Sequence, residues 1–350
     1  MTKTNPNFPI GVALIGAGMI GQTHVQALND LRDRATLRAV LSTRPGRATH
    51  LAEFYDSAAP AFTADLTDIT QDPDVQMVIV ATPPSVRIDL IRTLADAGKH
   101  ILLEKPVART VAEAEQVVEI CECAGVSLGV LFQHRMRKAS KAAARRIAAG
   151  DLGALGYADI SAPLWRPQSY YDELGRGTYE RDGGGVMMTQ AIHTIDLALS
   201  LTGPVASVQA MTATSPFHKM ESEDLAVAGL RFANGAVGSF IATTAAFPQA
   251  EEVITLHFEH ASLRVGKFGL DVMWRDGRVE RDHDAPDAPN LDDPAFTKHE
   301  WHRGVIEDFI GAITEGRAPI VTGRDALAAH RFIDAIEKSS RDGTPTQVSS

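Results

Sequence analysis

The sequence has few cysteines, no long apolar run and no block of basic residues. Only two cysteines, Cys121 and Cys123, occur among its 350 residues, one residue apart in a helical pattern. This spacing is too short for an ordinary structural disulfide and does not match zinc sites, so we expect a reducing compartment and no metal site. No apolar run approaches a membrane span, and the first ten residues lack the apolar core of a signal peptide. We therefore predict a cytoplasmic protein that does not associate with membranes.

The charge balance argues against nucleic acid as a partner. There are 44 acidic and 34 basic residues, giving a net charge of −10. An acidic surface repels a phosphate backbone. Hydrophobic residues make up 44% of the chain, which is enough for a full core in one large domain or two ordinary ones.

The first third of the chain alternates short apolar runs with amphipathic runs. This alternation predicts a doubly wound parallel sheet, which is an α/β Rossmann domain over residues 1–126. The expected strands are 10–16, 37–42, 75–81, 100–104 and 126–132, and the expected helices are 21–31, 48–55, 86–97 and 111–124.

The pattern changes after the last of these strands. Strand-like runs then follow one another with few helices between them, which predicts an α+β domain over 127–300 with a large open, mostly antiparallel sheet. Two helices in 301–350 close the chain. The expected strands are 157–164, 205–213, 224–232, 236–245, 252–259 and 261–265, with helices at 138–149, 187–201, 301–315 and 324–340 and a surface loop at 277–297.

A glycine-rich turn follows the first strand. Gly16 permits a tight turn, Gly18 lets the backbone approach a pyrophosphate, and Gly21 allows the next helix to pack closely on the strand. With Met19 and Ile20 between them, these residues are typical of a dinucleotide site at a helix N-terminus. The alternative is an ordinary glycine-rich turn.

The end of the second strand bears on the choice of cofactor. An NAD site usually has a carboxylate there for the ribose 2′-hydroxyl. This chain has Ser42, Thr43 and Arg44, and a guanidinium suits the 2′-phosphate of NADP. Arg47 is a possible second contact. We predict NADP, with NAD still possible; the alternative for Arg44 is an exposed arginine in a turn.

Two further strand ends carry candidate residues. Ala81, Thr82 and Pro83 end the third strand and could form a wall beside the ribose or nicotinamide, or a plain turn. Glu104 and Lys105 end the next strand, where the following proline holds the lysine extended. The carboxyl ends of parallel strands are where ligands bind in such sheets, so we assign Lys105 a catalytic role and place Glu104 beside the cofactor.

The second half contributes a histidine. Residues 183–185 are three consecutive glycines, which we interpret as backbone passing close to a ligand. The helix after them carries His193, with Thr189 one turn earlier on the same face, and we predict that both contact the substrate. The alternative is a satisfied core histidine. Asp196 is expected to be a structural partner.

A loop upstream is rich in aromatic and charged residues. Arg166, Tyr170 and Tyr171 suit a polar, ring-shaped substrate, although a packed surface loop is equally compatible with them. His299 and His302 have helical i, i+3 spacing without a third ligand, so we interpret them as surface residues.

Taken together, the ordered motifs resemble the glucose–fructose oxidoreductase, inositol dehydrogenase and rhizopine-catabolism (Gfo/Idh/MocA) oxidoreductase family. The resemblance covers almost the whole chain. The motifs are Gly-Ala-Gly-Met-Ile-Gly at 16–21, Ala-Thr-Pro-Pro at 81–84, Ala-Gly-Lys-His-Ile-Leu-Leu-Glu-Lys-Pro at 97–106, Phe-Gln-His-Arg at 132–135, Asp-Gly-Gly-Gly at 182–185 and Ile-His-Thr-Ile-Asp at 192–196.

This resemblance implies reversible oxidation of a hydroxyl on a sugar, cyclitol or sugar acid, with Lys105 and His193 at the proton-transfer site. It also implies that the open sheet is used for oligomer contacts and that the last helix packs back on the Rossmann domain. Two positions depart from the family pattern. Thr189 replaces a common carboxylate, which leaves open whether Lys105 or His193 is the principal acid/base. Gly175 replaces the tryptophan that precedes Arg176 in the branch acting on nucleotide-sugar acids.

We therefore expect an NADP-dependent oxidoreductase that transfers a hydride between the nicotinamide and a secondary alcohol or ketone of a sugar-like substrate. A homodimer or homotetramer is expected, because a large sheet needs both apolar faces covered. Two alternatives are a nicotinamide-dependent glycoside hydrolase of the same fold and a non-catalytic nucleotide sensor. A sensor would need neither Lys105 nor His193.

Overall fold

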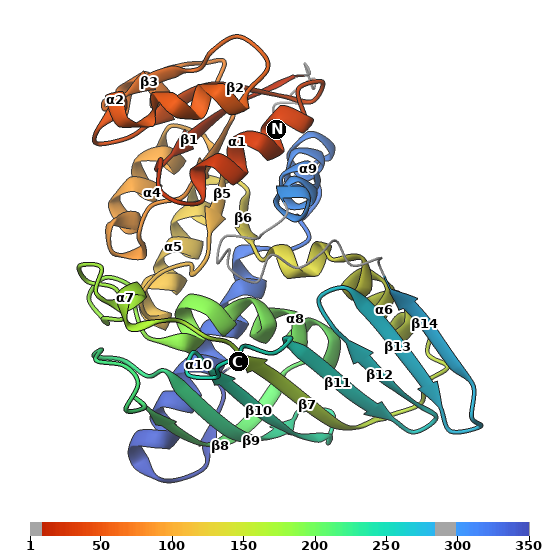
Figure 1. The fold of residues 1–350 in the computed structure, drawn as a ribbon. Helices are drawn as coiled ribbons and strands as arrows, with labels where there is room; N and C mark the ends of the chain where they lie inside the picture. Colours follow the sequence, from red (N-terminus) through yellow and green to blue (C-terminus); the bar gives the residue numbers. More distant parts are fainter. Residues whose placement is uncertain (1–8, 284–298, 350) are drawn as a thin grey trace. The chain divides into compact units, whose positions relative to one another are not determined.

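The computed structural model describes residues 9–283 and 299–349, which form two compact units (Figure 1). The first unit comprises residues 9–108, 112–133 and 299–326. The second comprises residues 109–111, 134–283 and 327–349. Each unit is built on one sheet.

The first unit contains the predicted doubly wound sheet. Six strands, all paired in parallel, lie in the order β3-β2-β1-β4-β5-β6. They are β1 (Ile10–Ile15), β2 (Ala35–Leu41), β3 (Ala61–Thr63), β4 (Met77–Val80), β5 (His100–Glu104) and β6 (Leu128–Leu131). The strands β1, β4 and β6 are wholly buried, as expected of a parallel sheet covered on both faces.

The helices of this unit follow the strands in turn. They are α1 (Gly21–Asp30), α2 (Pro45–Ala48), η1 (Thr49–Phe54), α3 (Thr67–Thr70), η2 (Pro84–Val86), α4 (Arg87–Asp96), α5 (Val111–Ala124), η3 (Gln133–Met136) and α9 (His299–Glu315), with α5 and η3 lying where the chain passes between the units. The helix α9 packs on α1 and reaches β6, where a side chain at Gly129 would lie 2.6 Å from the Phe309 ring. Glycine at this position therefore lets a C-terminal helix close the sheet.

Parallel pairing places the ends of four strands at one edge of the sheet. Strand order reverses between β1 and β4, which is the topological switch point of this sheet. Gly16 follows β1, Ser42 follows β2, Ala81 follows β4 and Lys105 follows β5. The fold therefore gathers the predicted cofactor residues of the first unit at one edge.

The second unit is a nine-stranded sheet in the order β14-β13-β12-β11-β7-β10-β9-β8-β15. Only β7 and β10 pair in parallel, so the sheet is mostly antiparallel, as predicted. The strands are β7 (Leu155–Pro163), β8 (Val205–Ala213), β9 (Leu225–Phe232), β10 (Val237–Thr243), β11 (Val253–Phe258), β12 (Ala261–Val265), β13 (Gly269–Trp274), β14 (Val279–His283) and β15 (Thr346–Gln347).

Helices cover one face of this sheet. They are α6 (Lys138–Ala148), α7 (Gln168–Tyr171), the π-helix η4 (Met187–Ala191), α8 (Ile192–Thr202) and α10 (Gly323–Asp342), of which α6, α8 and α10 pack on strands. The hydroxyls of Ser339 and Ser340 on α10 accept the backbone N–H groups of Ala210 and Thr212 in β8, at 3.0 and 2.8 Å. Side chains of β9 alternate between buried and exposed, so one face of the sheet is the core and the other is open.

Four strands were missing from the sequence interpretation, among them the two-residue edge strand β15. The short edge strand β3 has only three residues, and β13 was not anticipated. The predicted loop at 277–297 is wrong at its start, because Val279–His283 forms β14; residues 284–297 of that loop lie outside the described residues. Every residue of β14 is exposed and most are polar or charged, which suits an edge strand. Such a segment has no hydrophobic periodicity from which a strand could be predicted.

Candidate active site

The glycine turn of the first unit leaves room for a ligand at the start of α1. Gly16 has φ +103°, and a Cβ there would lie 2.7 Å from the carbonyl oxygen of Ala81. A Cβ on Gly18 would meet nothing within 4 Å, and Met19 is 73% exposed. Open space beside Gly18 at a helix N-terminus fits the pyrophosphate of a dinucleotide.

The residues after β2 lie at the surface. The backbone N–H of Arg44 donates to the Ser42 hydroxyl at 3.2 Å, and this contact shapes the turn into α2. Thr43, Arg44 and Arg47 are exposed, and no carboxylate occurs between Leu41 and Arg47. Two guanidinium groups therefore stand where the sequence predicted a contact with the adenosine ribose.

Two loops end β4 and β5 beside one another. The Thr82 hydroxyl is buried and has no hydrogen-bond partner among the described residues. Lys105 is half-buried, between buried Glu104 and buried Pro106. Its backbone N–H donates to the Glu104 carboxylate at 3.2 Å. Pro83, at the other strand end, is exposed, and its part in a wall beside the cofactor stays a prediction.

Glu104 is directed into the protein. Nε2 of His24 lies 2.9 Å from Oε1 of Glu104, and Nε2 of His302 lies 3.9 Å from the same oxygen. Burial alone would raise the pKa of Glu104, but the His24 hydrogen bond and the charges of His24, His302 and Lys105 outweigh it and lower that pKa to about 2. The Glu104 carboxylate therefore supports the lysine turn from within, and its place beside the cofactor stays a prediction.

His302 is one member of this buried cluster, so its interpretation as a surface residue was wrong. It is 1% exposed, and its ring meets that of His24 edge-on at 5.5 Å. Burial lowers the pKa of His302 to about 3, against the opposing charge of Glu104. His299, one turn earlier, is partly exposed and pairs with Asp30 at 3.0 Å.

In the second unit, the first and third of the three glycines are explained by close backbone contacts within the protein. A Cβ on Gly183 would lie 2.6 Å from Cα of Arg109, and one on Gly185 would lie 1.8 Å from the carbonyl oxygen of Glu223. The Glu223 carboxylate also accepts the N–H groups of Gly185 and Met187, at 3.0 and 3.1 Å. These contacts hold the start of the segment that carries His193 against Glu223. The ligand contact inferred from the sequence is therefore not needed to explain these two glycines.

A π-helix comes after this turn, and His193 lies just beyond the π-helix. The rare π geometry of Met187–Ala191 is often found at functional sites. His193 is 8% exposed, and its ring centroid lies 4.7 Å from that of His134. Asp196, the expected structural partner, binds Arg135 with two hydrogen bonds of 2.6 and 2.8 Å.

A chain of polar contacts runs from this segment to the upstream loop. The Thr189 hydroxyl donates to the Gly185 carbonyl at 2.6 Å and also contacts the Gln190 side chain. Gln190 in turn donates to the Tyr170 hydroxyl at 3.0 Å. Thr189 and Tyr170, two of the predicted substrate residues, are thus joined through Gln190.

The predicted substrate residues of the loop differ in burial and in their contacts. Arg166 is half-buried and its Nε has no partner among the described residues, while its guanidinium lies 5.6 Å from the Tyr170 ring. Tyr171 is instead buried against Thr244, with its hydroxyl 2.6 Å from the threonine oxygen. Burial raises the pKa of Tyr171 to about 12. Tyr171 therefore supports the loop, and its contact with a substrate stays a prediction.

Other polar groups important to the site were not found from the sequence. His218 is buried between the Asp224 carboxylate, 2.6 Å away, and the carbonyl of Arg166, 2.8 Å away. Arg87 is buried beneath the two strand ends of the first unit. Charged residues at these positions have no local pattern that separates them from surface residues.

Among the described residues, no helix is long and apolar enough to cross a membrane, and no cluster of His, Cys, Asp and Glu could hold a metal.

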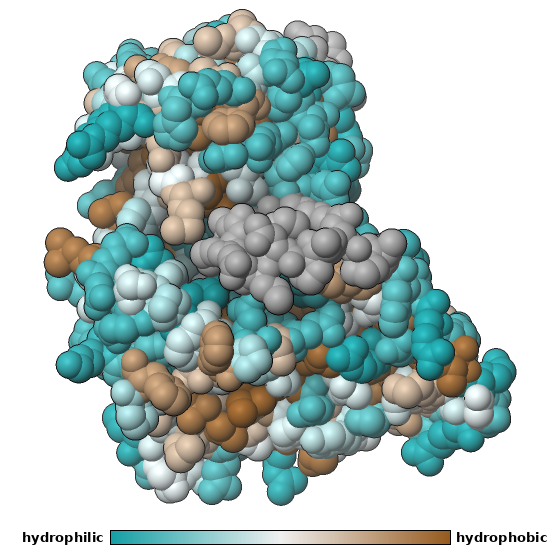
Figure 2. Space-filling model, viewed as in Figure 1, coloured by the Kyte–Doolittle hydropathy of each residue, from teal (hydrophilic) through white to brown (hydrophobic). Residues whose placement is uncertain are grey.

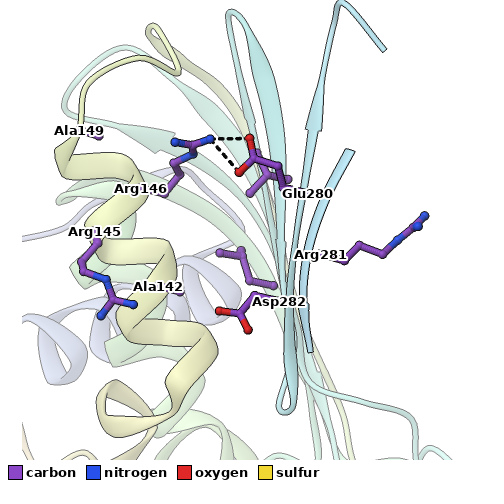
Figure 3. A pocket seen from close by; sticks show the side chains of 9 residues that line it. Ala142, Arg145, Arg146, Ala149, Glu280, Arg281 and Asp282 are labelled. Atoms are coloured by element: carbon purple, nitrogen blue, oxygen red, sulfur yellow. Dashed lines mark hydrogen bonds and ion pairs between the residues drawn. The ribbon is translucent and has the colours of Figure 1, made fainter. Parts of the chain in front are cut away.

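One pocket of about 400 Å³ lies away from these residues, between α6 and strands β13 and β14 (Figure 3). Arg146 donates to both oxygens of Glu280, at 2.6 and 2.8 Å, and Arg281 points away from the pocket. The Arg146 guanidinium is therefore already paired with a carboxylate, and we assign no ligand to this pocket.

The comparisons with known proteins agree with this arrangement. Residues 10–132 match the model of an oxidoreductase family with an NAD-binding Rossmann fold, and residues 140–264 match the model of the GFO/IDH/MocA C-terminal domain. The crystal structure of the WlbA dehydrogenase from Bordetella pertussis, in complex with NADH and UDP-GlcNAcA, is 32% identical over 97% of both chains, with a TM-score of 0.81. The chain belongs to the Gfo/Idh/MocA family. This membership makes it an oxidoreductase with a Rossmann domain that binds a nicotinamide dinucleotide.

Relatives within the Gfo/Idh/MocA family divide over the cofactor. The scyllo-inositol 2-dehydrogenase (NAD(+)) of Bacillus subtilis is 26% identical, covering 96% of this chain and 95% of the relative. The scyllo-inositol 2-dehydrogenase (NADP(+)) of the same organism is 24% identical, covering 95% of this chain and 94% of the relative. Cofactor choice therefore depends on the residues of the individual chain.

Proposed function

We propose that this Gfo/Idh/MocA protein is an NADP(H)-dependent dehydrogenase or reductase acting on a secondary alcohol or ketone of a sugar, cyclitol or sugar acid. The observation that carries the proposal is the edge of the first sheet. There the open glycine turn after β1 and the half-buried Lys105 after β5 lie at the carboxyl ends of parallel strands. The bound nicotinamide would accept or supply the hydride.

The protein's own part is to move a proton and to orient the reacting carbon. During oxidation, Lys105 or His193 removes the proton of the hydroxyl group while a hydride leaves the carbon that bears this group. During reduction, the proton returns to the oxygen. Glu104, His24 and His302 hold the turn that carries Lys105. We leave the principal acid/base to be assigned between Lys105 and His193, because Thr189 stands where many members have a carboxylate.

The preference for NADP rests on residues 42–44. A 2′-phosphate carries charge that a guanidinium binds strongly, whereas a 2′-hydroxyl needs a carboxylate acceptor, and this turn offers the guanidinium. Arg47, exposed in the next turn, would be a second cationic contact.

The substrate proposal rests on the polar loop of the second unit. Arg166 is half-buried with an unpartnered Nε, and Arg176, which pairs with Glu173, lies 4.2 Å above the Tyr170 ring. A guanidinium beside an aromatic side chain suits a hydroxylated substrate ring that bears a carboxylate. The solved WlbA complex with UDP-GlcNAcA supports including acidic sugars among the candidate substrates. Thr189, Tyr170 and Arg166 are our proposed substrate contacts.

A screen of absorbance at the reduced-nicotinamide band tests these proposals. Each cofactor is offered with neutral sugars, cyclitols, lactones and sugar acids, and steady turnover of one class identifies the substrate. A cofactor that stays bound without net turnover, combined with release of the leaving group from an aryl glycoside, would instead identify the glycoside hydrolase alternative. Binding of a nucleotide with neither activity would identify a sensor.

We also propose a homodimer or homotetramer formed through the open face of the nine-stranded sheet. Met211, Val227 and Ile241 are in register across β8, β9 and β10, and they are 55%, 38% and 37% exposed. Figure 2 shows hydrophobic residues among polar ones over this part of the second unit. An apolar row on an uncovered sheet is typical of a protein interface.

Light scattering at micromolar concentration tests the assembly. Val227→Lys with Ile241→Lys should reduce the molar mass to that of one chain, because two ammonium groups would enter the interface. Thr93→Lys, at an exposed position of α4, is the matched control. A wild type that is already monomeric would contradict the proposal.

A further inference from the structure

Arg87, the first residue of α4, is a buried guanidinium that the proposed proton transfer does not use. It is 2% exposed. Its Nε and Nη2 both donate to the carbonyl oxygen of Thr82, at 3.1 and 2.6 Å. Its Nη1 donates to the carbonyls of Glu104 at 2.6 Å and Val107 at 3.3 Å, and also contacts that of Pro106.

These acceptors belong to two different loops. Thr82 follows β4, whereas Glu104 ends β5 and the other two acceptors, Pro106 and Val107, follow Lys105. The two strands are neighbours, with Val80 opposite Leu103. One rigid guanidinium therefore joins the proposed cofactor wall to the turn that presents the proposed acid/base.

The arrangement needs a charged, forked group. Burial lowers the pKa of Arg87 to about 10, partly offset by the charge of Glu104, so the guanidinium remains charged at neutral pH. Removing it would leave several buried carbonyls without donors, which is unfavourable. A lysine would keep the charge, but its single ammonium lacks the planar fork that reaches both loops at once.

We propose that Arg87 is a positioning residue that sets the place of Lys105 relative to the cofactor wall at Thr82. The proposal rests on the proposed function of Lys105. Arg87 acts through backbone carbonyls, so it touches neither substrate nor cofactor. If Arg87 served stability alone, its folded variants should turn over substrate at the wild-type rate.

Kinetics of Arg87→Met and Arg87→Lys separate these roles, with exposed Arg92→Met on the same helix as the control. A displacement of about 1 Å at a reacting group lowers rates roughly 100-fold, so we expect a fall in kcat of this order for Arg87→Met. KM should change little, because ground-state contacts with the substrate lie elsewhere. Arg87→Lys should recover part of the thermal stability lost in Arg87→Met and only part of kcat. Wild-type kcat in folded Arg87→Lys would overturn the proposal, and this variant decides the matter if Arg87→Met does not fold.

A second measurement is independent of turnover. Lysines are labelled by reductive ¹³C-methylation, and the Lys105 NMR signal is assigned by its absence in Lys105→Met. This signal should move in both Arg87 variants and stay in place in Arg92→Met. An unmoved signal would overturn the positioning role. A moved signal in a protein that oxidises no sugar would refute the proposed function while supporting the role of Arg87.

Discussion

The buried histidine of α9 should make the first unit sensitive to mild acid. His302 has a pKa lowered to about 3 by burial, against 6.5 for an exposed histidine. The unfolded chain therefore binds one more proton than the folded chain between these values. Stability from this group is fully present above pH 6.5 and is lost progressively as the pH falls toward 3.

The magnitude follows from the slope of 1.36 kcal/mol for each pH unit. Between pH 7 and pH 5, the unfolded-state protonation of His302 should remove about 2 kcal/mol from the free energy of unfolding. Glu104 contributes little in this window, because its own loss of stability occurs below its unfolded pKa of 4.5, toward about 2. His302→Gln cannot titrate, so the variant should lose about 2 kcal/mol less than the wild type over this window.

Urea unfolding at pH 7 and pH 5 measures this difference. Trp301 lies in the first unit, whereas Trp165 and Trp274 lie in the second. Replacing those two by phenylalanine leaves Trp301 fluorescence as a probe of the first unit alone. His299→Gln, three residues before His302 and partly exposed, is the control and should behave as the parent does. Equal losses in parent and His302→Gln would refute the reasoning, because His302 would then titrate alike in the folded and unfolded chain.

The remaining predictions concern catalysis, the cofactor and folding. Lys105→Met should lower kcat by roughly two to four orders of magnitude and remove one limb of the pH profile, with NADP binding nearly intact; near wild-type turnover would show that the lysine is structural. His193→Asn should lower kcat less than Lys105→Met if the lysine is the main acid/base, and more if the histidine is. Arg44→Ala should weaken NADP binding by about 1–3 kcal/mol and hardly affect NAD, and equal affinity of the wild type for both would contradict the NADP preference. Gly185→Ala should lower the melting temperature, because its Cβ would lie 1.8 Å from the Glu223 carbonyl oxygen; an unchanged melting temperature would contradict this reason for the glycine.

Local patterns in the sequence determined the fold class and the start of the site. Alternation of apolar and amphipathic runs predicted both sheets, because burial on both faces and burial on one face leave different periodicities. The glycine turn at Gly16 and the run ending in Lys105 were recognisable because strand ends in a parallel sheet share one edge. The NADP preference and the pairing of Lys105 with His193 in one reaction stay predictions.

The buried polar contacts were decided by tertiary structure alone. Arg87, His24 and His302 look like surface residues in the sequence, because a charged or polar side chain has no local signal of its burial. Their partners are carbonyls and carboxylates from distant segments, and only the packing of α1, α4 and α9 around the strand ends supplies them. The same holds for Gly185: the sequence showed that backbone must come close there, and the structure showed that it comes close to Glu223.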